Sequence, residues 1–175
     1  MPDAAMRDAL DATFSKRVRD LSGRLSKGEI DLMEWQITMR EELRSVHALQ
    51  LIAGAGGDKS QVSADDWLKL GSELRSQYLY LEDFARAVER GDLSDAQLSA
   101  RAELYAHSAR TTYWKQATSG VDLPAMPGEG SECLTNCNCS WDKRGDGWHW
   151  VLHASESCPT CIDRAAKWSP YRSVN

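Results

Sequence analysis

The cysteines of this chain are confined to its last quarter. All five lie between positions 133 and 161, and none precedes them. Four form two closely spaced pairs, Cys133 with Cys137 and Cys158 with Cys161. A Cys-x2-4-Cys turn presents two thiolates to one ion, and two such turns complete the tetrahedral shell that zinc requires. The spacing therefore predicts a structural zinc site with Cys133, Cys137, Cys158 and Cys161 as ligands.

Three other residues are alternative ligands. Cys139 lies two positions after Cys137, so in an extended segment both side chains point the same way and compete for one coordination position. His149 or His153 could also replace a thiolate. A disulfide pair with a leftover thiol is the competing interpretation. The odd number of cysteines and the lack of a secretory signal favour reduced thiols and a cytosolic folding compartment instead.

The segment between the two cysteine pairs has the pattern of a β-hairpin. Two short runs of alternating character flank positions 144–147, where Gly and Asp tolerate the backbone angles of a tight turn. Two cysteine turns beside a hairpin are typical of a zinc ribbon. We therefore expect residues 132–175 to form a small zinc-binding module.

A catalytic zinc site is a second possibility for the same segment. His153 and Glu156, followed by Cys158 and Cys161, partly match the His-x-Glu and Pro-Cys-x-x-Cys elements of zinc-dependent nucleobase deaminases. The histidine and glutamate are one residue too far apart, and no proline precedes Cys158. A four-thiolate shell also leaves no coordination position open for water. We therefore expect no enzyme activity and no catalytic residue.

Residues 1–120 have the pattern of helices throughout. Apolar residues recur every three or four positions from 4 to 27, and Gly28 then stands at a C-terminal cap position. Asp31, Ser63 and Ser94 provide N-cap signals for three further helices. Residues 121–131 contain two prolines and two glycines and are predicted to be a linker. The predicted fold is mainly α: a bundle of about four long helices followed by a zinc-ribbon-like β-hairpin module.

Composition narrows the possible partners. The net charge is −5, and acidic residues outnumber basic ones in both 1–120 and 121–175, so nothing indicates strong nucleic-acid binding. No apolar run approaches the roughly 18 residues of a membrane span. His47 and His107 lie in predicted helices and are expected to be packing or surface residues. The apolar stripe from Trp67 to Val88 is long enough to suggest self-association or packing on a larger body.

Three segments resemble one protein family. Residues 78–105, residues 123–128 and the run from Cys133 to Trp141 are similar to proteins encoded in the head-gene clusters of tailed bacteriophages. The most specific part is Asn136-Cys-Asn-Cys139, which resembles an Asn-Cys-Arg-Cys element of head morphogenesis proteins. Here the Cys-x-x-Cys pair follows this element instead of preceding it, and Asn138 replaces the arginine.

The resemblance implies a structural function. It suggests a minor capsid or head morphogenesis protein, assembled in the cytoplasm of the host bacterium and located in the virion, with capsid or portal proteins as partners. The alternative function is a cytoplasmic zinc-ribbon module that binds a protein or a nucleic acid.

Overall fold

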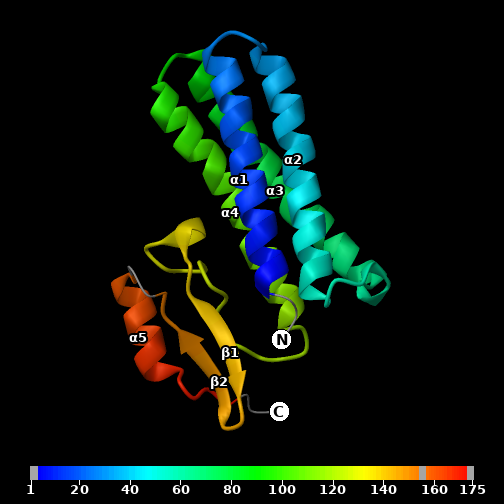
Figure 1. The fold of residues 1–175 in the computed structure, drawn as a ribbon, viewed down its shortest axis with the longest axis vertical. Helices are drawn as coiled ribbons and strands as arrows, with labels where there is room; N and C mark the ends of the chain where they lie inside the picture. The colour runs from blue at the N-terminus through cyan, green and yellow to red at the C-terminus, as the bar shows by residue number, and fades with distance from the viewer. Residues whose placement is uncertain (1–3, 154–156, 173–175) are drawn as a thin grey trace.

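The computed structural model describes residues 4–153 and 157–172. Four long helices come first: α1 (Ala4–Ser26), α2 (Leu32–Gly54), α3 (Ala64–Glu89) and α4 (Asp95–Ala117). They are followed by the strands β1 (Ser140–Arg144) and β2 (Gly147–Val151) and a short helix, α5 (Pro159–Lys167). Two single-turn 3-10 helices, η1 (Lys59–Gln61) and η2 (Leu134–Asn136), lie in the connections. The predicted mainly α fold with a C-terminal hairpin is confirmed (Figure 1).

The long helices begin where side chains cap them. The Asp31 carboxylate accepts a hydrogen bond from a backbone N–H in the first turn of α2. Ser63 with Asp66, and Ser94 with Gln97, form reciprocal capping boxes at the starts of α3 and α4. These contacts involve residues only three positions apart, so the sequence alone predicts these starts correctly.

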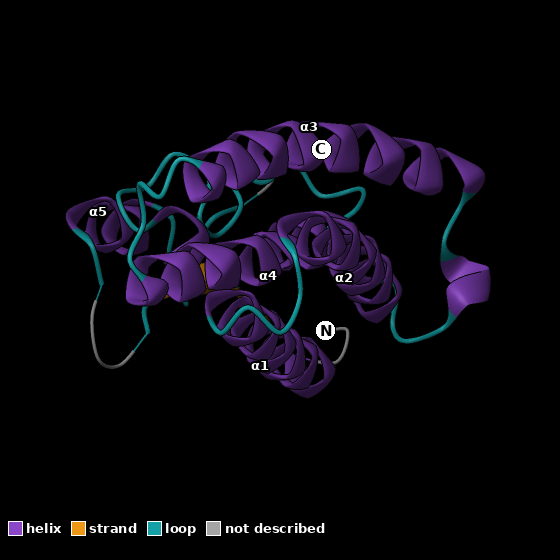
Figure 2. Ribbon diagram, turned by 90° about the horizontal axis from the view of Figure 1, so that it is seen from above, coloured by secondary structure: helices purple, strands orange, loops and turns teal. Residues whose placement is uncertain are grey.

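The helices surround one main core. Figure 2 shows α1, α2 and α4 alongside one another, with α3 lying across them on one side. At the centre, the Trp35 ring meets the edge of Phe84 at 5.2 Å, and Phe84 stacks on Tyr105 at 5.8 Å. The surrounding buried apolar side chains include Phe14, Val18, Leu21, Met39, Leu43, Val46 and Leu81. The bundle therefore has its own hydrophobic core, independent of the cysteine-containing module.

The apolar stripe of α3 packs within the chain. Leu81 and Phe84 are fully buried in the main core, and Leu70 and Leu74 form a second cluster with Leu51 of α2. Self-association, which this stripe suggested, stays a prediction. None of the helices in the described part of the chain is both long and apolar enough to cross a membrane.

A buried histidine lies between α2 and α4. His47 Nδ1 is 2.8 Å from Thr112 Oγ1, and His47 Nε2 is 3.2 Å from Ser108 Oγ. Burial lowers the pKa of His47 from 6.5 to about 4, with a smaller opposing effect from Glu73 and a further lowering by Lys115. His47 is therefore a neutral packing residue, as its sequence context predicted.

The C-terminal module has a tryptophan core. The hairpin pairs Trp141 with Trp150, and their rings pack edge to face at 5.1 Å. Trp168, just after α5, stacks on Trp141, and the Arg164 guanidinium lies 5.2 Å from the rings of both Trp150 and Trp168. Helix α5 therefore covers the inner face of the hairpin. Helix α5 was not expected from the sequence, although Pro159 in its first turn is a common helix-start signal.

The module folds back onto the lower end of the bundle (Figure 1). Tyr113 and Trp114 of α4 share a buried cluster with Trp141. Residues 121–131 run along the module: the Trp141 indole donates to the Ala125 carbonyl at 2.9 Å, and Leu123 is buried. The segment predicted as a linker is therefore packed along much of its length.

The first prediction concerns the close approach of α2 and α4. A Cβ atom on Gly54 would lie 2.6 Å from the Tyr113 carbonyl oxygen and 2.8 Å from Gln116 Cβ. We expect Gly54→Ala to lower the free energy of unfolding by about 1–3 kcal/mol, because the helices must move apart. Gly71→Ala is the matched control, since a Cβ there meets nothing within 4 Å and helix propensity favours alanine. Urea denaturation followed by circular dichroism measures both, and equal effects would contradict the packing argument.

The second prediction concerns His47 and pH. The pKa of His47 in the folded protein, about 4, lies below the ordinary histidine value of 6.5, so between these pH values only the unfolded chain binds the proton. His47 therefore contributes roughly 3 kcal/mol to the free energy of unfolding. This contribution is fully present above pH 6.5 and is lost as the pH falls to about 4. We expect His47→Gln to have a shallower dependence of unfolding free energy on pH in this window, by up to one proton. Identical slopes in the two proteins would show that His47 titrates normally in the folded state.

Candidate metal centre

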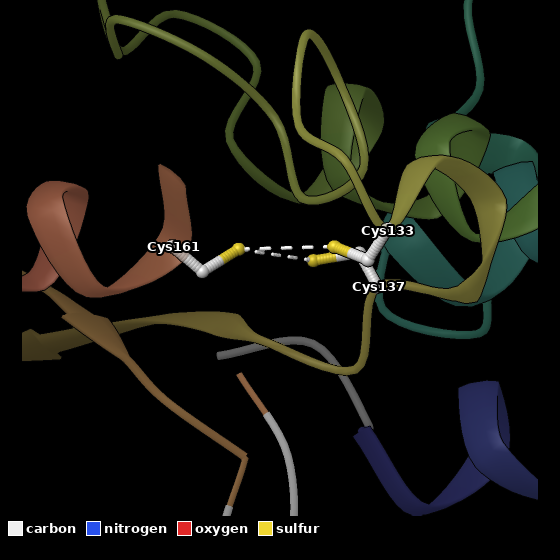
Figure 3. Close-up of side chains that lie close together, drawn as sticks. All are labelled: Cys133, Cys137 and Cys161. Atoms are coloured by element: carbon white, nitrogen blue, oxygen red, sulfur yellow. Dashed lines mark hydrogen bonds between the residues drawn. The ribbon is translucent and has the colours of Figure 1, made fainter. Parts of the chain in front are cut away.

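Three thiols converge where the turn at residues 133–137 meets helix α5. The Sγ atoms of Cys133, Cys137 and Cys161 all lie within 4.8 Å of one another. Figure 3 shows Cys161 reaching from α5 toward the other two, at Sγ–Sγ distances of 3.9 Å to Cys133 and 3.7 Å to Cys137. Cys161 is fully buried and Cys137 nearly so. This group can hold a metal ion.

The fourth predicted ligand lies beside this group. Cys158 Sγ is 3.5 Å from Cys133 Sγ, and both residues are half-buried. The structure thus brings three of the four predicted ligands into one group, and the fourth, Cys158, contacts Cys133 but does not lie within 4.8 Å of all the others. Their sulfurs form a connected series from Cys158 through Cys133 and Cys161 to Cys137.

Each pair is positioned by a turn. Cys133 and Cys137 flank η2, in which Asn136 N–H bonds the Cys133 carbonyl at 2.9 Å. Leu134 has a left-handed backbone, with φ of 46°, which is unusual for a branched side chain. Gly128 packs beneath this turn, because a Cβ there would lie 2.5 Å from the Leu134 carbonyl oxygen. A glycine at position 128 is therefore required by the shape of the cysteine turn.

The second pair uses a helix start. Cys158 is the N-cap residue of α5, Pro159 follows it, and Cys161 lies in the first turn. The Thr160 N–H donates to Glu132 Oε2 at 3.3 Å, which connects this turn to the residue before Cys133. Hydrogen bonds lower the pKa of Glu132 to about 2, and the largest effect comes from the side chain of Thr160. No local sequence pattern indicates Glu132, because its contact spans 28 positions.

Burial keeps two of the thiols protonated when no ion is present. It raises the pKa of Cys137 to about 12, against an opposing hydrogen bond from the Cys139 N–H, and it raises the pKa of Cys161 as well. Neighbouring thiols add to both effects. A coordinated divalent cation removes such protons, so metal binding would release them.

Cys133 differs from these two thiols. Burial opposes its ionisation, but hydrogen bonds from the Ser131 hydroxyl, at 3.3 Å, and from the neighbouring thiols leave its pKa below the ordinary value. Cys133 is therefore the thiol of this group that ionises most readily.

The alternative ligands occupy different positions. Cys139 is buried in the same cluster as Cys137 and Cys161, and its backbone N–H acts to lower the pKa of Cys137. His149 Nε2 is 2.8 Å from Asp146 Oδ1, at the turn of the hairpin. His153 lines a polar cavity of about 230 Å³ between α1, α4 and the cysteine turn. Within the part of the chain that the structure describes, neither histidine belongs to the group of converging ligand atoms. Glu156 lies outside the described residues.

The third prediction distinguishes ligands from the fifth cysteine. Cys161→Ser should remove most of the bound metal, because its sulfur is central to the group and no other described donor replaces it. Cys139→Ser should retain more metal, because Cys139 is not one of the three cysteines whose sulfurs all lie within 4.8 Å of one another. Elemental analysis of the purified proteins measures the metal per chain and identifies the element. Equal loss in the two variants would mean that Cys139 is itself a ligand.

Comparisons of this chain with protein-family models, with curated proteins and with solved structures find no match.

Proposed function

We propose that the cysteine group binds one zinc ion through Cys133, Cys137, Cys158 and Cys161. The observation that carries this proposal is the spacing of the sulfurs. A tetrahedral ion with zinc–sulfur bonds of about 2.3 Å holds its sulfurs roughly 3.8 Å apart. Three of the six Sγ–Sγ distances, at 3.5, 3.7 and 3.9 Å, lie close to that edge length. Cys158 lies outside the group of sulfurs that are all within 4.8 Å of one another, so ion binding would draw it closer to Cys137 or Cys161.

The ion would have a structural role. Four thiolates fill the coordination shell and leave no place for an activated water molecule. A two-stranded hairpin is marginally stable by itself, and a small module gains folding free energy directly from a bound metal. Here the ion would join α5 to the turn at residues 133–137 and so enclose the tryptophan core between them.

The second part of the proposal is that the protein is a minor head component of a tailed bacteriophage. Its support is the resemblance of the Asn136-Cys-Asn-Cys139 element to head morphogenesis proteins. In the structure this element makes contacts beyond the cysteine group: the Asn136 amide oxygen is 3.3 Å from His107 Nδ1, and the Asn138 amide oxygen accepts from Arg110. Asn136, which this element shares with the family, and Asn138, which stands in place of the family's arginine, therefore both contact α4.

Such a protein would act by holding its neighbours in place. We propose capsid or portal proteins as its partners, with assembly in the host cytoplasm and a final location in the phage head. The outer face of α3 is a suitable contact region, because Leu68, Leu79 and Tyr80 are 73%, 63% and 61% exposed.

The fourth prediction tests this function in particles. Purified heads of the phage or prophage that encodes this chain should contain the protein and zinc, measured by mass spectrometry and elemental analysis. Leu79→Asp should fold normally but enter heads less efficiently, because it places a charge on the exposed apolar face. His153→Ala is the control and should keep both zinc and incorporation. Heads that lack the protein, with the chain found instead on a cytoplasmic protein or nucleic acid, would favour the alternative zinc-ribbon function.

A further inference from the structure

A charged side chain of the bundle holds the turn that carries Cys137. Arg110 of α4 donates through Nη1 to the Asn138 side-chain oxygen and, at 3.4 Å, to the Cys137 carbonyl oxygen. Through Nη2 it donates to the Asp11 carboxylate of α1. One guanidinium thus contacts both the bundle and two successive residues of the cysteine turn.

A histidine extends this contact by one residue. His107 lies three positions before Arg110 on the same face of α4. Its Nδ1 is 3.3 Å from Asn136 Oδ1, and its Nε2 is 3.7 Å from Asp11 Oδ2. Positions 136, 137 and 138 are therefore all held from the bundle. We call Asp11, His107 and Arg110 the clasp.

The clasp lies in a sheltered place. The side chains of Asp11 and Arg110 are only 9% and 18% exposed. Charges withdrawn from water are costly unless they are paired and hydrogen-bonded. Asp11 Oδ1 has no hydrogen-bond partner among the described residues. The other oxygen, Oδ2, accepts the hydrogen bond from Arg110. The pairing of buried Asp11 with half-buried Arg110 therefore holds the guanidinium beside the cysteine turn.

We propose that Arg110, oriented by Asp11, is a positioning residue of the metal centre. It fixes the backbone of Cys137, so the Cys137 sulfur is already in place when the ion arrives. Its positive charge also lies next to a centre that, with four thiolates and one zinc ion, carries two negative charges. This inference rests on the proposed zinc site and adds that the bundle controls how tightly the site binds zinc. Metal binding and the docking of the module on the bundle stabilise each other, because the same backbone serves both.

The test compares zinc affinity in full-length variants. Competition with a chromogenic chelator should show Arg110→Gln binding zinc roughly 10-fold to 100-fold more weakly, the range seen when residues that orient metal ligands are changed. The matched control is Arg40→Gln, which breaks the 2.7 Å ion pair with Glu82 between α2 and α3. The control should keep its affinity within about 2-fold, because it does not touch the ligands.

Two further measurements separate positioning from folding. The double variant Asp11→Asn with Arg110→Gln removes both charges, so no buried carboxylate is left uncompensated, and it should still bind zinc weakly while circular dichroism shows intact helices. With cobalt in place of zinc, the visible absorption bands report ligand geometry and should differ from those of the wild type.

The possible outcomes are distinct. Wild-type affinity and wild-type cobalt spectra in both Arg110 variants would overturn the clasp while leaving the zinc site intact. A wild-type protein that binds no zinc would overturn the zinc site and the clasp together.

Discussion

The cysteine sulfurs of residues 133–137 and of α5 converge at the place where the two ends of the C-terminal module meet. Burial raises the pKa of Cys137 and Cys161, so without an ion these thiols are neutral groups with weak hydrogen bonds. A cation would turn the same positions into strong bonds between two segments that are otherwise joined by hydrogen bonds, from the Thr160 N–H to Glu132 and from Arg164 to the Glu129 carbonyl. The edge-to-face pair of Trp141 and Trp150 then has a fixed cover in α5.

The four long helices have a hydrophobic core that does not include the cysteine group. Their core around Trp35 and Phe84 is complete within residues 4–117. The lower end of the bundle is different, because Trp114 is buried against the module and Arg110 contacts the cysteine turn. Loss of an ion would therefore affect the end of the bundle that faces the module more than its centre.

The proposed role in a phage head uses these two parts differently. The bundle would be the rigid body, with the exposed apolar side chains of α3 available to a neighbouring protein. The module would be closed by the ion and held against α1 and α4 by the clasp. Neither part needs a reactive group, and His47 is neutral and enclosed in the core.

Helix starts at Ser63 and Ser94, the hairpin turn and the four clustered cysteines were determined by the sequence alone, because each depends on residues a few positions apart. The tertiary structure decided the rest. Helix α5 has only nine residues and lacks a side-chain cap, so its helical signal is weak without the hairpin beneath it. Asp11 and Arg110 are 99 positions apart, and no local pattern relates them. Their pairing exists only because α1, α4 and the cysteine turn meet at one place.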